Sequence, residues 1–183
     1  MRTVAAVAAG AALVVVVVVV VLSTLARRDD IAASPFPAAA APTPAATTAP
    51  ALRTVRLYYY DPARDRDQTG NVLCSDKGLV AVERRVPPSD TVIEDTVRLL
   101  LRGELTPDER ARGITTEFPL PGLELRSATL VSGLLTLTFD DRLGRTVGGA
   151  CRTGVLWSQI RRTAEELPGV QRVRFLPQDI FQP

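Results

Sequence analysis

The segment from Asp65 to Asp76 has the residue spacing of a calcium-binding loop. Asp65, Asp67 and Thr69 stand at loop positions 1, 3 and 5, Gly70 at position 6 and Asp76 at position 12. Position 12 normally holds the longer Glu, and helices normally flank such a loop, whereas a strand is predicted before this one. The segment is therefore either a calcium site or a polar connection in which Asp and Gly form turns.

Cys74 and Cys151 are the two cysteines of the chain. Outside the cytoplasm two cysteines are expected to form a disulfide, whereas in the cytosol they stay reduced. A bridge between them would close a long loop and stabilise the fold by about 4.5 kcal/mol in the chain-entropy model. The alternative is a pair of unpaired thiols that fill space.

Three consecutive tyrosines could offer a surface on which sugar rings stack. In a strand, Tyr58 and Tyr60 would point to one face and Tyr59 to the other, so at most one or two of the rings reach solvent. We therefore expect these tyrosines to pack in the strand, with Tyr58 and Tyr60 as surface contacts for a ligand as the alternative.

Nothing in the chain marks a catalytic centre. Histidine is absent, which excludes Ser-His and Cys-His pairs and the commonest metal ligand. The adjacent carboxylates Asp140 and Asp141 would point to opposite faces of a strand and could not share acid-base work. Arg84, Arg85 and the pair at 161–162 are interpreted as solvated surface charge. We expect neither an enzyme nor a cofactor.

The charge balance argues against a nucleic-acid partner. The 183 residues contain 22 basic and 20 acidic side chains, which gives a formal net charge of +2. Nucleic-acid binding depends on a basic surface that neutralises phosphates, and such a small excess does not provide one.

The chain divides into a short N-terminal segment (1–3), an apolar run (4–26), a Pro- and Ala-rich linker (27–52) and one folded domain (53–183). The apolar run is uncharged and long enough to cross the roughly 30 Å hydrocarbon layer. We expect an uncleaved single-pass anchor in the cell membrane with an extracytoplasmic domain. Secretion after cleavage of a signal peptide is the alternative. The linker reads as a flexible spacer.

Within the folded domain, two strand patterns come first. Alternating apolar residues mark strands at about 55–60 and 80–86. A helix follows, with a capping box predicted from Thr91 and Glu94 and an end at Gly103. Ser132 and Gly133 join two further strands in a tight hairpin. A second helix over 155–167 and a strand over 170–176 complete a ββαββαβ order. We predict an α+β fold: a mixed sheet with two helices on one face.

The stretch LLLRGELTPDERARGITTEFP at 99–119 resembles the GerMN domain of sporulation and spore germination proteins. The pattern L-L-x-G-x-x-T-x-x-E-x-x-x-G is formed by Leu100, Leu101, Gly103, Thr106, Glu109 and Gly113. The strand pair that ends at Asp140 and the VQRVRFL stretch at 170–176 extend the resemblance to about 54–176. The Gln that family members commonly have in the second helix is matched here by Gln159.

The resemblance implies an envelope-facing bacterial module without known catalytic residues, similar in topology to domains that assemble into rings. We therefore expect it to bind an envelope protein partner or its own copies. The alternative is a module that binds peptidoglycan or another wall polymer through the tyrosines, or an enzyme that acts on that polymer.

Overall fold

The computed structural model describes residues 51–182. The predicted segments 1–3 and 4–26, and nearly all of the predicted linker 27–52, lie outside the described residues. Among residues 51–182, no helix has the length and apolar character needed to cross a membrane.

The elements are β1 Arg53–Tyr60, the 3-10 helix η1 Asp76–Gly78, β2 Leu79–Val86, α2 Val92–Leu101, α3 Pro107–Ala111, β3 Leu123–Val131, β4 Leu134–Asp141, α4 Ala150–Glu165 and β5 Arg172–Leu176.

The strands form two sheets rather than the single mixed sheet that we predicted. β1 and β2 make an antiparallel pair, and β4 pairs with β3 antiparallel and with β5 parallel. The second edge of β1 is already occupied. The Tyr58 amide donates to Thr163 Oγ1 of α4 at 2.9 Å, and Tyr60 exchanges backbone hydrogen bonds with Thr115. A helix and a loop therefore satisfy the edge where a third strand would join.

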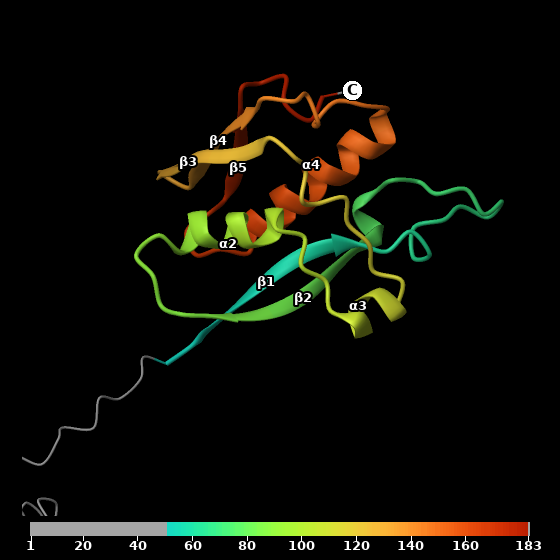
Figure 1. Ribbon diagram of the computed structural model, residues 1–183, viewed down its shortest axis with the longest axis horizontal. Coiled ribbons are helices and arrows are strands. Elements are labelled where there is room, and N and C mark those ends of the chain that lie inside the picture. Colours follow the sequence, from blue (N-terminus) through green and yellow to red (C-terminus); the bar gives the residue numbers. More distant parts are fainter. Residues whose placement is uncertain (1–50, 183) are drawn as a thin grey trace, which may run out of the picture. The chain divides into compact units, whose positions relative to one another are not determined.

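Helices α2 and α4 lie between the two sheets (Figure 1). Both cover the same face of the β3-β4-β5 sheet, as predicted, and the β1-β2 pair lies on their other side. One buried apolar cluster joins all of these layers. Its largest fully buried side chains are Leu57 and Tyr59 of β1, Val97 and Leu100 of α2, Leu135 and Leu137 of β4, and Leu156 and Ile160 of α4.

The capping box lies at α3 and not at α2. Thr91 precedes α2 but makes no side-chain cap bond, and its hydroxyl donates to Asp95 instead. Before α3, the Glu109 amide donates to Thr106 Oγ1 at 3.2 Å and the Thr106 amide donates to Glu109 Oε2 at 2.8 Å. Thr106 has the extended backbone that such a box requires, and Thr91 does not. The short helix α3 was missed, so the predicted ββαββαβ order lacks one helix.

The predicted hairpin between β3 and β4 is confirmed. Ser132 and Gly133 both have positive φ, at 48° and 80°, and Val131 pairs with Leu134 across the turn. Two consecutive residues with positive φ match the right-handed twist of the flanking strands. The sequence Ser-Gly therefore sets the register of the central strand β4.

Candidate functional site

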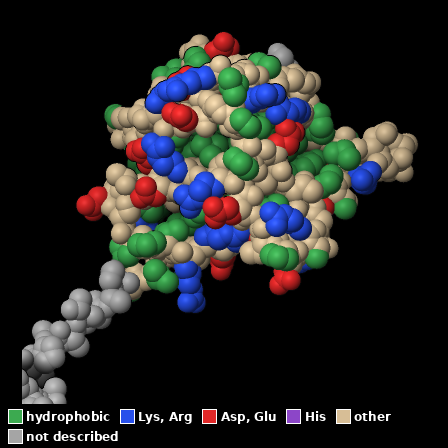
Figure 2. Space-filling model, viewed as in Figure 1, with side chains coloured by type: hydrophobic (Ala, Val, Ile, Leu, Met, Phe, Trp, Pro, Cys, Tyr) green, Lys and Arg blue, Asp and Glu red, His purple; other side chains and the backbone are tan. Residues whose placement is uncertain are grey.

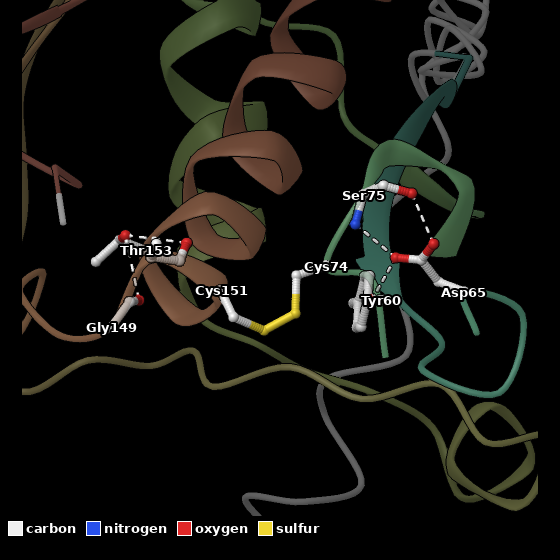
Figure 3. Close-up of a disulfide and its surroundings, with 8 residues drawn as sticks. Tyr60, Asp65, Cys74, Ser75, Gly149, Cys151 and Thr153 are labelled. Carbon is white, nitrogen blue, oxygen red and sulfur yellow. Dashed lines mark hydrogen bonds between the residues drawn. A yellow bond between two sulfur atoms is a disulfide. The ribbon is translucent and has the colours of Figure 1, made fainter. Parts of the chain in front are cut away.

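Cys74 and Cys151 form the disulfide that was one of the two predicted states of the cysteine pair. Cys74 lies near the end of the long connection from β1 to β2, and Cys151 lies in the first turn of α4 (Figure 3). Their Cα atoms are 5.2 Å apart and 77 residues apart in the sequence. The bridge thus fixes the 61–78 connection, which we call the 61–78 loop, against the start of α4.

A cleft of about 410 Å³ lies beside this disulfide. The 61–78 loop, the segment 115–117 and the first turns of α4 form its walls. The lining residues are Tyr60, Val72, Cys74, Thr115, Thr116, Glu117, Gly149, Cys151, Arg152, Val155, Leu156 and Gln159. A concave site with mostly apolar walls and a few polar groups is typical of binding sites.

Gln159 is the most deeply buried polar residue in the lining, with 1% of its surface exposed. Its Oε1 accepts a hydrogen bond from Thr116 Oγ1 at 3.1 Å, and its Nε2 donates to the Val155 carbonyl at 3.3 Å. This is the glutamine that matches the family pattern. It holds the 115–117 segment against α4, so its place in the pattern has a structural explanation.

The charged lining residues are also paired with each other. Arg152 Nε donates to Glu117 Oε2 at 2.6 Å, and Arg152 Nη1 donates to the carbonyls of Arg145 and Val147 at 2.9 and 2.6 Å. The pair leaves the cleft without net charge. Its polar groups hold the walls of the cleft together.

One exposed apolar side chain, Val72, lines the cleft, and two others belong to residues adjoining its lining: Leu73 lies between Val72 and Cys74, and Val147 is hydrogen-bonded to Arg152. Val72 is 38% exposed and Leu73 is 49% exposed on the 61–78 loop, and Val147, whose carbonyl binds Arg152, is 61% exposed. Figure 2 shows hydrophobic side chains at the base of the projecting loop, while hydrophobic, basic and acidic side chains intermingle over the rest of the visible face. We call Val72, Leu73 and Val147 the apolar rim. Exposed apolar groups beside a cleft are typical of binding surfaces.

Tyr60 is buried, which agrees with strand packing and excludes it as a surface contact. The 61–78 loop covers it, so that 6% of it is exposed, and its hydroxyl donates to Asp65 Oδ2 at 2.6 Å. Burial, together with the hydrogen bond to Asp65, raises the pKa of Tyr60. Tyr58 is half-buried, its hydroxyl donates to Glu166 Oε1 at 2.9 Å, and its ring lies under the Arg162 guanidinium. The two tyrosines therefore do not form one stacking surface.

The residues with calcium-loop spacing have separate partners. Asp65 accepts hydrogen bonds from Tyr60 and from the amide and hydroxyl of Ser75. Asp67 accepts from the amide and the hydroxyl of Thr69, and the side chain of Asp76 pairs with Arg161. Within residues 51–182 no group of three or more acidic, His or Cys residues could hold a metal ion. The structure does not bring Asp65, Asp67, Thr69 and Asp76 together around one point.

Hydrogen bonds set the charge state of these loop carboxylates. Those from Thr69 and Asn71 lower the pKa of Asp67 to about 2. Burial opposes ionisation of Asp65, but the hydrogen bonds from Ser75 and Tyr60 outweigh burial and lower its pKa. Ionised Asp65 thus acts as the internal anchor of the 61–78 loop, a role that turn composition alone did not indicate.

A largely buried ion pair, which we did not predict, joins β2 to α3. Arg84 of β2 donates from Nη1 and Nη2 to the two carboxylate oxygens of Glu109, both at 2.7 Å, and from Nη2 to the Glu104 carbonyl at 2.9 Å. Arg84 is therefore not a solvated charge. The alternation of β2 could have indicated this, because Arg84 falls on the same face as Val82 and Val86.

The chain is similar to known proteins in its sequence and in its fold. The family model Germane, described as sporulation and spore germination, matches residues 56–178. The tandem GerMN domains of the Bacillus subtilis sporulation protein GerM are 20% identical, with a TM-score of 0.46 over 68% of this chain and 38% of that chain. A candidate lipoprotein from Clostridium perfringens is 12% identical, with a TM-score of 0.36 over 68% of this chain and 74% of that one. No curated protein sequence matches.

Proposed function

The chain belongs to the Germane family of sporulation and spore germination, and from this premise we propose that it is a non-catalytic, membrane-anchored module of the bacterial cell envelope. The domain lies outside the cytoplasmic membrane and uses the cleft beside the disulfide to bind a protein partner. In the self-associating form of this proposal, the protein partner is a second copy of the chain.

The observation that supports binding most directly is the apolar rim. Val72, Leu73 and Val147 are exposed next to a cleft whose charged groups are already paired. A partner that covers these side chains removes apolar surface from water without breaking an ion pair, which favours a protein surface over a charged ligand. The wall-polymer alternative has less support, because Tyr60 is buried.

Two observations support the envelope location. The uncharged run over 4–26 has the length and composition of a membrane span. The disulfide between Cys74 and Cys151 is typical of proteins outside the cytosol. If the proposal holds, the full chain sediments with membranes, resists extraction at alkaline pH and is cut in its folded domain by protease added to intact spheroplasts. Recovery of a soluble chain that begins after residue 26 would support secretion instead.

Site-specific crosslinking in the bacterium that encodes the chain tests the binding surface. A photoreactive residue replaces Val72 in the full-length protein, and a matched variant carries it at Val131, which is 63% exposed on β3 and does not line the cleft. We expect an adduct with one protein, or with a second copy, from position 72 only. Equal adducts from both positions, or adducts with wall polymer alone, would contradict the proposal.

The captured protein must then bind directly. With the purified partner, Val72→Asp should weaken binding by about tenfold or more, because it places a charge in the apolar contact. Val131→Asp is the control and should leave the affinity unchanged. If both substitutions have the same effect, the cleft is not the binding surface.

A further inference from the structure

The Cys74–Cys151 disulfide is accessible to solvent although it ties two distant parts of the chain. Cys151 is exposed, Cys74 is half-buried, and both line the open cleft. Figure 3 shows the bridge spanning from the first turn of α4 to the end of the 61–78 loop, with the ring of Tyr60 beside it. A reagent in the cleft therefore lies beside the two cysteines while the domain remains folded.

The local structure makes Cys151 a good leaving group. It is the second residue of the 16-residue helix α4, where unpaired amides and the helix dipole favour negative charge. The first turn contains no acidic residue, and Gly149 at the N-cap provides no side chain to bond these amides. A thiolate in this position is stabilised, and stable thiolates leave a disulfide faster.

The backbone of Cys74 lies in the left-handed region, with φ of 55°. This conformation is unfavourable for residues other than glycine. The disulfide and the hydrogen bonds of the adjacent residues keep Cys74 in it. Opening the bridge removes one of these constraints.

The 61–78 loop has other attachments on both sides of Cys74. The Leu73 amide donates to the Asp65 carbonyl at 2.9 Å, and the Ser75 hydroxyl donates to Asp65 Oδ1 at 2.6 Å. Asp76 pairs with Arg161 of α4. When the bridge opens, these contacts keep the loop near its place, and Cys74 loses its attachment to α4.

From these observations we propose that the Cys74–Cys151 bridge is an exchangeable disulfide that an external dithiol, of the kind presented by thiol-disulfide oxidoreductases, reduces on the folded domain. A thiolate of the dithiol attacks Cys74 Sγ, the Cys74–Cys151 bond breaks, and Cys151 leaves as a thiolate. The second thiol of the dithiol then attacks the dithiol's first sulfur, which is bonded to Cys74 in the mixed disulfide. This bond breaks and Cys74 is released as a thiol. Two electrons pass to the domain, and the dithiol becomes a disulfide.

The first test compares reduction with unfolding. The oxidised full-length chain in detergent micelles is mixed with dithiothreitol at neutral pH, samples are quenched with an alkylating reagent, and the mass shift counts free thiols over time. We expect the rate to rise in proportion to the dithiothreitol concentration and to exceed the global unfolding rate in the same buffer, with circular dichroism retained. A rate that levels off at the unfolding rate would overturn the proposal.

Two substitutions at Gly149 test the role of the helix terminus while keeping the disulfide. The site has room for a side chain and an extended backbone suited to an N-cap residue. Asp and Asn have similar shapes, but only Asp adds negative charge next to Cys151. Gly149→Asp should be reduced roughly two- to fivefold more slowly than Gly149→Asn. Equal rates would contradict a charge-stabilised leaving group.

Single-cysteine variants identify which sulfur leaves. In Cys74→Ser the alkylation rate of Cys151 should show a midpoint below the usual thiol pKa of about 8.5. In Cys151→Ser the midpoint of Cys74 should lie at or above that pKa. The opposite order would overturn the assignment of Cys151 as the leaving group. Neither readout depends on a binding partner, so these tests and those of the proposed function can fail separately.

Discussion

At the scale of single residues, Tyr59 has a hydroxyl group without a partner. The side chain is 0% exposed in the core, its hydroxyl makes no hydrogen bond, and burial raises its pKa to about 12. A buried polar atom without a partner lowers stability by its desolvation cost. Tyr59→Phe should therefore leave the free energy of unfolding unchanged or raise it by about 1 kcal/mol. Urea denaturation monitored by circular dichroism measures this change.

The neighbouring tyrosine is the control for this prediction. Tyr60→Phe removes a buried hydrogen bond to Asp65 and should lower the free energy of unfolding by about 1–3 kcal/mol. If Tyr59→Phe costs as much as Tyr60→Phe, the Tyr59 hydroxyl has a partner, such as a buried water molecule, and the interpretation of its environment is wrong.

Glu109 should make stability depend on pH. The two hydrogen bonds from Arg84, aided by the Thr106 amide, lower its pKa from 4.5 to about 2. Because the folded-state pKa lies below the unfolded one, the carboxylate stabilises the fold above pH 4.5, and this contribution is lost as the pH falls toward 2. Glu109→Gln should cost about 2 kcal/mol at pH 7 and less at pH 3.

Denaturation at pH 7, 4 and 3 measures this dependence. Glu104→Gln is the matched control, because Glu104 forms an exposed ion pair with Arg102. Exposed pairs contribute little, so this variant should differ from the wild type by less than about 1 kcal/mol at any pH. A Glu109→Gln deficit that stays constant from pH 7 to pH 3 would contradict the lowered pKa of Glu109.

At the scale of elements, the two glycines of the family pattern differ in how much room their surroundings leave for a side chain. Gly103, after α2, has φ of 65°, and a Cβ atom there would lie 1.9 Å from the Phe118 carbonyl oxygen. Gly113, after α3, has φ of 88°, but its nearest neighbour would be Asp61 Oδ1 at 3.5 Å. Gly103→Ala should lower the free energy of unfolding by about 3 kcal/mol or more, and Gly113→Ala by about 1 kcal/mol.

Melting temperatures of the two alanine variants, measured side by side, test this difference. Both substitutions carry the cost of a positive φ, so the excess at Gly103 reports the close approach to Phe118. Equal losses would mean that the backbone around Phe118 shifts to admit a methyl group.

The sequence predicted local elements better than their partners. Alternation located β1 and β2, and the Ser-Gly dipeptide located the β3-β4 turn, because these patterns depend on neighbours in the chain. The division into two sheets depends on Thr163 and Thr115 reaching the edge of β1, and the burial of Tyr60 depends on the covering 61–78 loop. No local pattern reports such contacts, and α3 has too few residues for helical periodicity to appear.

The same limit applies to the candidate site. The cysteines could be paired from the expected compartment alone. The cleft could not be predicted, because Val72, Thr116 and Arg152 come from three separate segments. Apart from the two cysteines and Tyr60, the lining residue with a signal in the sequence was Gln159, which matched the family pattern and binds Thr116 in the cleft.

At the scale of the whole molecule, the disulfide joins the β1-β2 connection to α4 across 77 residues. The chain-entropy model gives about 4.5 kcal/mol for a loop of this length. Replacing both cysteines with serine should therefore lower the free energy of unfolding by about that amount in urea, with fluorescence of Trp157, the single tryptophan, as the probe. Domains of this size have a total stability of about 5–15 kcal/mol, so the variant should still fold, with a lower melting temperature. A loss below about 1 kcal/mol would mean that constraint in the native loop, such as the left-handed backbone at Cys74, offsets the entropic gain.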